Sequence, residues 1–160
     1  MKDSNLDNLK KRYSVLQKKY SLPSFQEMNE DFVIEKVSEE DSEILIREIR
    51  KFIADRFMNY LRFVETILNP SSASIFIFSI VKSLKKEEKD ELEEIYKKLA
   101  KFELDLIELD VSFSEEKEAE FIKNSFKVWQ EVKRDFLKVI QKIKKDWSKD
   151  EDKKNKSFIA

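Results

Sequence analysis

The sequence predicts an all-α fold: an elongated antiparallel bundle of three long helices, one medium N-terminal helix and two short helices. The chain has 160 residues, no glycine and two prolines, so little in it breaks a helix. Charged residues make up 41% of the chain, far above the average of about 25% for globular proteins. Apolar side chains recur every three or four residues, which is typical of helices with one buried face.

The N-terminal part of the chain predicts two helices and a connector. Residues 4–21 form the predicted medium helix, which ends because Pro23 disfavours helix in the residue before it. Its apolar positions follow a heptad spacing and are Leu6, Leu9, Tyr13, Leu16 and Tyr20. Ser24 and Glu27 match a capping box and predict a short helix. Residues 32–37 are predicted to form an extended connector, with a short strand as the alternative.

A long helix is predicted over residues 38–68. Ser38 is its expected N-cap, and the three acidic residues that follow would complement the helix dipole. The apolar side of this segment is broad, so we expect it to pack against more than one neighbour. Its four arginines are interpreted as solvated, paired side chains; they are Arg47, Arg50, Arg56 and Arg62.

The densest apolar run of the chain lies at residues 75–81. Asn69 can act as an N-cap with Pro70 at the first helical position, which favours a short helix over residues 71–84. A buried strand is the alternative, because β-branched and aromatic residues suit a strand equally well. We expect a central helix buried between the two halves of the chain. Any side of it left exposed would be a partner site.

Two further long helices complete the bundle. Residues 92–113 carry a heptad row, and a second apolar row lies beside it: Ala100, Leu104, Ile107 and Val111. The last helix begins after Ser112 or Ser114 and is predicted to end near Trp147. The charged residues 148–160 predict a disordered tail. Residues 1–147 are therefore expected to form a single helical domain, from which the helix of residues 1–21 could detach or swap between protomers.

The residues that the chain lacks exclude several chemistries. Without cysteine and histidine it has no disulfide, thiolate site, Ser-His-Asp triad or histidine metal site. Without glycine it has no phosphate-binding loop of the familiar types. We therefore expect no enzyme, cofactor, catalytic residue or metal ligand. The N-terminus has no apolar signal and no apolar run is long enough to span a membrane, so we expect a cytoplasmic protein without a membrane partner.

Two acidic clusters match the first half of an E-E-x-x-E metal motif. They are Glu39, Glu40 and Glu43, and Glu87, Glu88 and Glu91. This pattern resembles that of all-α nucleotide pyrophosphohydrolases, and the resemblance implies a magnesium site and a metal-dependent phosphohydrolase. The E-x-x-D that would complete the site does not follow at a suitable distance. Both clusters also begin predicted helices, where the helix dipole explains them.

The net charge of −1 hides an uneven distribution. Residues 1–20 contain six basic and two acidic side chains, and residues 123–160 contain twelve and six. Basic helices with interleaved aromatic residues suggest a nucleic-acid- or ribosome-associated accessory protein. Solvated helix faces are the simpler explanation, because long helices routinely carry such charge.

The surplus of apolar surface favours a non-catalytic helical protein–protein interaction module. Such a module would be an adaptor or a small subunit of a larger assembly, and its partner would be another protein or a second copy of the chain. The candidate partner interface comprises Leu6, Leu9, Tyr13, Leu16, Tyr20, Phe76 and Phe78. A nucleic-acid partner is the second hypothesis, and a metal-dependent phosphohydrolase is the third.

Overall fold

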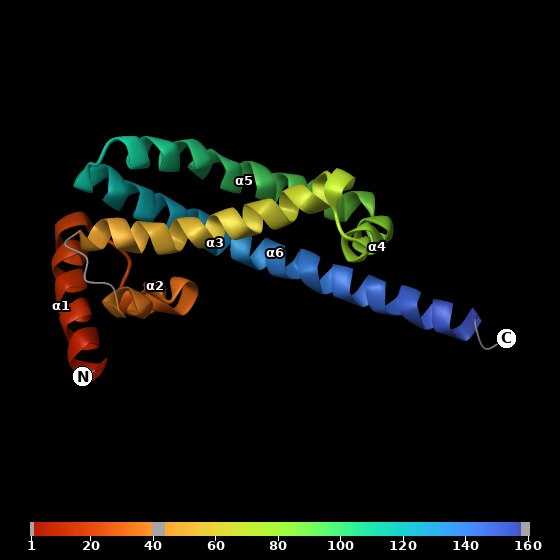
Figure 1. Ribbon diagram of the computed structural model, residues 1–160, viewed down its shortest axis with the longest axis horizontal. Helices are drawn as coiled ribbons and strands as arrows, with labels where there is room; N and C mark the ends of the chain where they lie inside the picture. The colour runs from red at the N-terminus through yellow and green to blue at the C-terminus, as the bar shows by residue number, and fades with distance from the viewer. Residues whose placement is uncertain (1, 40–43, 158–160) are drawn as a thin grey trace. The chain divides into compact units, whose positions relative to one another are not determined.

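The computed structural model describes residues 2–39 and 44–157, and this part of the chain is all-α. In chain order its elements are α1 (Lys2–Tyr20), α2 (Phe25–Phe32), the 3-10 helix η1 (Ile34–Glu39), α3 (Leu45–Leu68), the 3-10 turn η2 (Pro70–Ser72), α4 (Ile75–Ser83), α5 (Lys86–Val111) and α6 (Glu115–Ser157) (Figure 1). The predicted set of long, medium and short helices is confirmed. Residues 75–81 form a helix, so the strand alternative is wrong.

The chain divides into two compact units. Unit 1 comprises Met1–Met58 and Phe102–Trp129, and unit 2 comprises Asn59–Lys101 and Gln130–Ala160. Helices α1, α2 and η1 therefore belong to unit 1, and α4 belongs to unit 2, while α3, α5 and α6 each supply a part to both. The elongated shape and the single domain over residues 1–147 stay predictions.

Unit 1 has an aromatic centre around Phe57 of α3. The centroid of its ring lies 5.3 Å from that of Phe102 in α5 and 5.9 Å from that of Trp129 in α6. Phe32 of α2 lies 6.3 Å from the same ring. All four side chains are buried. Aromatic pairs at such separations contribute about 0.5–1.5 kcal/mol each beyond their buried area.

Helices α3 and α5 run antiparallel within unit 1. Arg50 of α3 pairs with Asp110 of α5, whereas Phe57 of α3 contacts Phe102 of α5. The residue numbers therefore rise along one helix as they fall along the other. The predicted antiparallel arrangement therefore holds for this pair, whereas α3 and α6 run parallel, because Arg50 pairs with Glu118 and Phe57 contacts Trp129.

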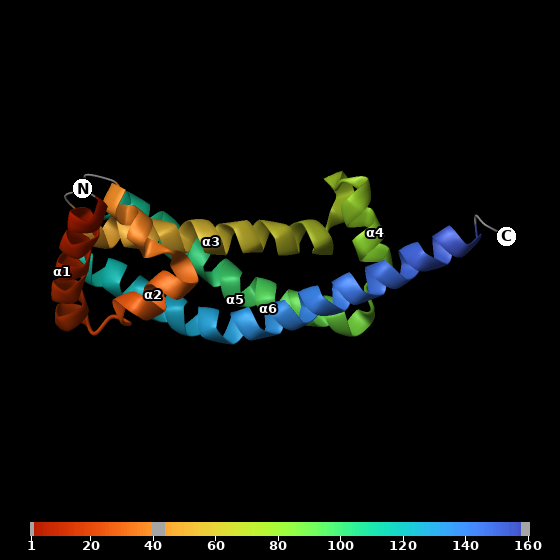
Figure 2. The ribbon, with the colours of Figure 1, turned by 90° about the horizontal axis from the view of Figure 1, so that it is seen from below.

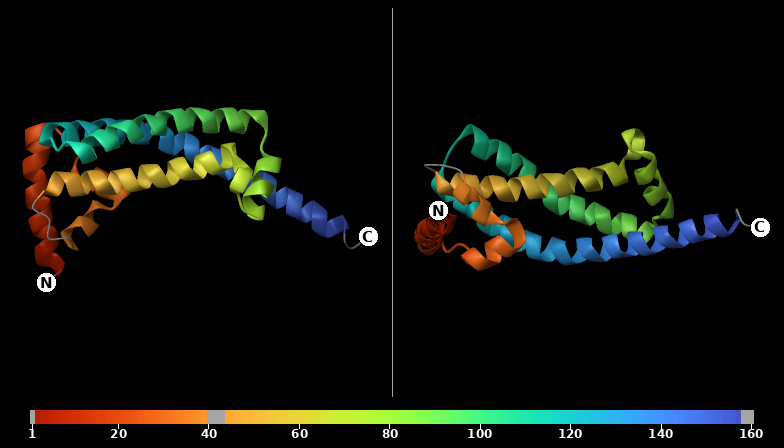
Figure 3. Two further views of the ribbon diagram at one scale, coloured as in Figure 1. Left: turned by 45° about the horizontal axis from the view of Figure 1, so that its top comes forward. Right: turned by 60° about the horizontal axis from the view of Figure 1, so that its bottom comes forward.

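In unit 2, α5 and α6 are also antiparallel. Lys98 of α5 pairs with Glu131 of α6, and Glu91 of α5 pairs with Lys142 of α6. Helix α4 turns back from the end of α3 towards α6, which Figure 3 shows from two sides. Its Phe76 ring makes an edge contact with Trp147 of α6 at 5.5 Å between centroids.

Helices α1 and α2 are joined by a tight connection at Pro23. The hydroxyl of Tyr13 in α1 donates to the Pro23 carbonyl at 2.7 Å. The capping box of α2 is confirmed: Ser24 accepts from the backbone of Glu27, and the Glu27 carboxylate accepts from the backbone of Ser24. Within unit 1, α1 lies across the direction of α3 rather than along it, with α2 beside it (Figures 1 and 2).

The segment after α2 differs from its prediction. Val33 ends α2 in the left-handed conformation, with φ 56° and ψ 43°. Asn29 then holds the chain in a turn, because its side chain donates to the Glu35 carboxylate and accepts from the Glu35 backbone. A 3-10 helix results, so the extended connector over residues 32–37 is wrong. Ser38 lies inside this helix and is not the N-cap of α3.

The ends of the long helices also differ from their predictions. Helix α3 begins at Leu45 rather than after Ser38, and residues 40–43 of the predicted first turn lie outside the described residues. Helix α6 continues to Ser157, ten residues past the expected end near Trp147. No glycine or proline interrupts this charged segment, so backbone hydrogen bonding can continue through it. The last residues of the predicted tail, 158–160, lie outside the described part.

Replacing Val33 by glycine should stabilise the protein by about 0.5–1 kcal/mol. A β-branched residue in the left-handed region costs about 1–2 kcal/mol, which glycine avoids, although glycine also gains entropy in the unfolded chain. The matched control is Val15→Gly, at an exposed position within α1, which should lose roughly 0.3–0.5 kcal/mol. Urea denaturation measures the free energy of unfolding of both variants. If Val33→Gly lost as much stability as Val15→Gly, the left-handed conformation of Val33 would be contradicted.

Candidate interaction surfaces

Helix α5 carries apolar side chains on two opposite sides. One side is buried and includes Leu106 and Leu109. Leu104 and Ile107 each precede one of these leucines by two residues, and two residues turn an α-helix by about 200°. They therefore lie on the opposite side with Val111, and Leu104, Ile107 and Val111 are 74%, 56% and 83% exposed. We call these three residues of unit 1 the α5 stripe.

Acidic side chains surround the α5 stripe. Residues 103–111 contain four exposed carboxylates and no basic residue: Glu103, Asp105, Glu108 and Asp110. Two of them have partners within unit 1, since Glu108 pairs with Lys117 of α6 and Asp110 pairs with Arg50 of α3. A stripe of apolar side chains bordered by carboxylates is a surface that suits an apolar, basic partner.

Helix α4 is the most apolar helix and yet one of the most exposed. Ile75, Phe76 and Phe78 are 89%, 53% and 41% exposed, and Ile80 is its one fully buried residue. The prediction that this helix is buried is therefore wrong. The reason lies in its contacts with α6, which involve the side of Phe76 and Ser79 and leave the side of Ile75 and Phe78 in solvent.

The contacts between α4 and α6 in unit 2 determine which side of α4 remains exposed to solvent. The indole of Trp147 in α6 donates a hydrogen bond to the Ser79 hydroxyl at 3.2 Å and contacts Phe76. Phe78 lies two residues before the buried Ile80, so it points away from that contact. Ile75 lies one turn before Phe78 on the same face and is almost fully exposed.

The exposed face of α4 is basic. Lys82 continues the spacing of Ile75 and Phe78, and all three lie on one side of the helix at positions i, i+3 and i+7. Lys85 and Lys86 lie just beyond the end of α4, and all three lysines are exposed. Residues 75–86 contain no acidic side chain. We call Ile75, Phe78 and these lysines the α4 face.

Helix α4 also begins differently from its prediction. Pro70 opens the separate 3-10 turn η2, and Asn69 makes no side-chain capping bond there. The N-cap of α4 is Ser74, whose hydroxyl accepts from the backbone of Ile77. The break that the sequence placed at Pro70 is real, but the helix starts five residues after it.

The predicted seam of α1 is partly buried within unit 1. Leu9 and Tyr13 are buried, whereas Leu6, Leu16 and Tyr20 are partly exposed. Helix α1 lies against η1 and α2, and Tyr13 contacts the ring of Phe25 in α2, so the structure holds α1 in place on its own chain. Exchange of this helix between protomers stays a prediction.

Polar contacts tie the end of α1 to the start of α6. The Tyr20 hydroxyl and the Lys19 ammonium both donate to one oxygen of Glu115, at 2.6 and 2.9 Å. These hydrogen bonds, the Tyr20 bond first, lower the pKa of the Glu115 carboxyl. Residues 95 and 96 positions apart in the sequence thus meet, which the charge pattern alone did not indicate.

A buried ion pair joins α3 to α6 in unit 1. The Arg50 guanidinium donates to both oxygens of Glu118, with its Nε 2.8 Å from Oε2. Its Nη2 also donates to Asp110 of α5 at 2.8 Å. Arg50 is 3% exposed and Glu118 is fully buried, so the interpretation of Arg50 as a solvated side chain is wrong.

The surroundings of Arg50 keep it charged. Burial by itself lowers the pKa of its guanidinium, but hydrogen bonds and charge attraction from Glu118 and Asp110 outweigh burial, so the pKa is raised. Arg47 adds a second cation: its Nε lies 3.5 Å from Glu118, and its guanidinium stacks over the Phe113 ring at 4.7 Å. Two cations and two carboxylates balance, which indicates a structural network rather than a free binding site.

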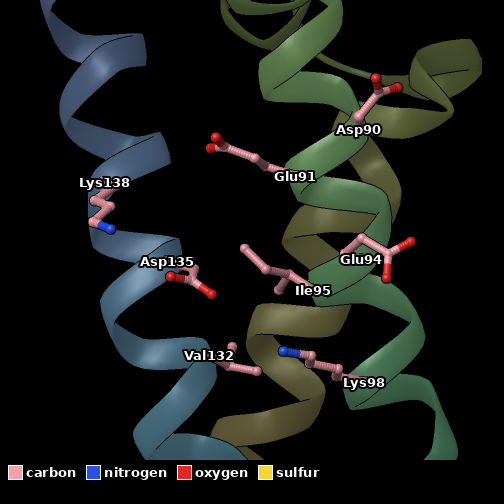
Figure 4. Close-up of a pocket in the computed structure, with 8 residues that line it drawn as sticks. All are labelled: Asp90, Glu91, Glu94, Ile95, Lys98, Val132, Asp135 and Lys138. Carbon is pink, nitrogen blue, oxygen red and sulfur yellow. The ribbon is translucent and has the colours of Figure 1, made fainter.

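A groove of about 400 Å³ lies between α5 and α6 in unit 2. It is lined by Asp90, Glu91, Glu94, Ile95, Lys98, Val132, Asp135 and Lys138 (Figure 4). Glu91 and Asp135 extend into the space between the helices, whereas Asp90 and Glu94 point away from it (Figure 4). Its carboxylates therefore do not converge.

The acidic clusters that resembled a magnesium motif do not gather into a site. Glu88 is buried and accepts from the backbone of Lys85 at 2.6 Å, which caps α5. Glu91 pairs with Lys142 instead. Within the described ranges, no group of three or more acidic side chains is placed to hold a metal ion. Two members of the earlier cluster, Glu40 and Glu43, lie outside these ranges.

Comparisons with known proteins found no matching family model, no matching curated protein and no matching solved structure. The described helices also include none with the length and apolar character needed to cross a lipid bilayer. The surfaces of this chain are therefore interpreted from their own chemistry.

Replacing Glu118 by glutamine should lower the free energy of unfolding by roughly 3 kcal/mol. The change removes the charge that compensates Arg50, and breaking one partner of a buried pair typically costs about 3–5 kcal/mol. The matched control is Glu116→Gln, at an exposed position in the same turn of α6, which should stay within about 0.5 kcal/mol.

Denaturation of both variants and of the double variant Arg50→Met/Glu118→Leu completes this test. The double variant should recover part of the loss, because the buried Arg50 charge is removed together with its partner, whereas Arg47 still loses its pairing with Glu118. A Glu118→Gln variant as stable as its control would show that the pair is not buried in solution.

Proposed function

We propose that this protein is a non-catalytic helical interaction module that binds a protein partner through the α5 stripe. The observation that carries the proposal is the second apolar side of α5, where Leu104, Ile107 and Val111 lie exposed at helical spacing. Helices whose apolar residues serve only their own core do not repeat such residues on the opposite side. An adaptor or a small subunit of an assembly uses this kind of surface.

The size of the α5 stripe fits a helix-sized partner. Its residues span two turns, or about 10 Å along the helix axis. Complete burial of an aliphatic side chain contributes about 1.5–3 kcal/mol, so burial of three such side chains offsets much of the cost of association and supports weak, reversible binding. The recognition of an apolar stripe by a partner helix follows the same i, i+3, i+7 pattern.

The surrounding carboxylates support binding rather than simple solvation. Scattered exposed leucines are ordinary on protein surfaces, and Leu137 of α6 is one, at 51% exposed. The α5 stripe differs because three apolar residues are contiguous and share a border of four carboxylates. Charged borders around an apolar centre are typical of interfaces that form and separate.

Replacing Leu104 by glutamate should abolish partner binding while leaving stability within about 0.5 kcal/mol of the wild type. The side chain is 74% exposed, so the fold loses little, whereas an interface would have to bury an unpaired charge. Affinity capture from an extract, quantified by mass spectrometry, measures the loss.

The matched control for this experiment is Leu137→Glu, the same substitution at an exposed leucine outside the α5 stripe. It should capture the same proteins as the wild type. If Leu104→Glu captures them equally well, the α5 stripe is not the interface and the proposal fails.

A second candidate function is the association of unit 2 with nucleic acid. One side of α6 carries five exposed basic side chains at spacings of four, four, three and four residues: Arg134, Lys138, Lys142, Lys145 and Lys149. Such a row follows a phosphate backbone over about 22 Å of helix. Lys142 also pairs with Glu91 at 3.4 Å, so part of the row has partners within the chain.

This second function predicts binding of RNA or DNA that weakens steeply with salt. Replacing Lys145 and Lys149 by glutamine should reduce the salt dependence by about two counterions, because each phosphate contact contributes about one. The control is the replacement of Lys10 and Lys11 of α1, in unit 1, by glutamine, which should leave the salt dependence of binding unchanged. No shift of RNA or DNA at about 50 mM salt would dispose of this function.

A further inference from the structure

We propose that the partner of the α5 stripe is the α4 face of a second copy of this chain. This inference rests on the proposed function and adds the identity of the partner. The two surfaces lie in different units, and each is an apolar helix face that its own unit leaves uncovered. Joining them between copies would cover both.

The apolar residues of the two surfaces match in spacing. Leu104, Ile107 and Val111 occupy positions i, i+3 and i+7 of α5. Ile75 and Phe78 occupy the first two of these positions on α4, and the stem of Lys82 occupies the third. Each surface therefore covers about 10 Å of helix, and side chains of one can fill the spaces between those of the other.

The two surfaces are opposite in charge. The α4 face has three exposed lysines and no acidic side chain over residues 75–86. The α5 stripe is bordered by four carboxylates and no basic side chain over residues 103–111, and two of the four, Glu103 and Asp105, have no ion pair among those described. Opposite potentials favour contact between the two faces, whereas two α4 faces or two α5 stripes would bring like charges together.

The same charges favour a protein over a lipid surface as the partner of the α4 face. Exposed aromatic residues beside lysines also suit an anionic membrane. A membrane, however, would leave the α5 stripe uncovered, because its carboxylates repel anionic lipids. A second copy accounts for both exposed surfaces with one contact.

Contact between two different surfaces is heterologous, so each copy offers one free surface after the first contact. The two free surfaces can then meet each other, which closes a two-fold dimer, or they can bind further copies to give a larger ring or an open chain. Two helical turns on each side bury less area than a stable dimer needs, so the association should be weak and dependent on concentration.

The test uses light scattering of the full chain over a range of concentrations, with two variants. Phe78→Glu disables the α4 face, and Leu104→Glu disables the α5 stripe. Each variant alone should be monomeric, with an apparent Kd for self-association raised at least about tenfold, because a charge would be buried against an apolar surface. Leu137→Glu serves as control and should assemble like the wild type.

Mixing the two variants is the decisive step. A Leu104→Glu copy keeps an intact α4 face, and a Phe78→Glu copy keeps an intact α5 stripe. The mixture should therefore form a one-to-one complex that does not grow further. A complex of either variant with itself would show that like surfaces meet and would overturn the proposal.

The remaining outcomes distinguish a failure of this inference from a failure of the proposed function on which it rests. A wild type that stays monomeric at every concentration overturns self-association, but it leaves capture of another protein through the α5 stripe intact. Unchanged capture by Leu104→Glu overturns the interaction function itself. Binding of a monomeric wild type to vesicles of anionic lipid, lost in Phe78→Glu, would assign the α4 face to a membrane instead.

Discussion

The packing of unit 1 depends on one ring, that of Phe57. Helices α2, α5 and α6 each place an aromatic side chain against it, so four helices meet at a single buried cluster. Rings of this size allow few arrangements at high packing density. The cluster therefore sets the rotation of each long helix about its own axis, and that rotation determines which row of apolar residues faces inward.

The ion pair of Arg50 and Glu118 adds a second restraint to the same unit. Two buried charged groups must stay paired at hydrogen-bonding distance, because an unpaired charge in the interior costs several kcal/mol. Arg50 reaches carboxylates on both α5 and α6, so three helices are held in register. Apolar packing alone tolerates a shift by one turn, whereas this network does not.

These restraints turn one row of α5 inward and leave the other in solvent. A helix with two apolar rows can bury only one of them in a small bundle, and the second becomes available for binding. Helix α4 also leaves an apolar side in solvent, because its contacts with Trp147 of α6 are made by the side of Phe76 and Ser79. One chain thus presents two apolar surfaces, one bordered by carboxylates and the other by lysines.

The sequence by itself determined what is local: the helix class, the number and order of helices, the capping box at Ser24 and the second apolar row of α5. Only the tertiary structure decided which rows are buried, because periodicity marks apolar sides without saying which helix covers them. Exposure of Phe78, burial of Arg50 and its pairing with Glu118 all depend on residues distant in sequence. Hydrogen bonds between neighbouring residues are encoded locally, whereas burial depends on how the chain packs against itself.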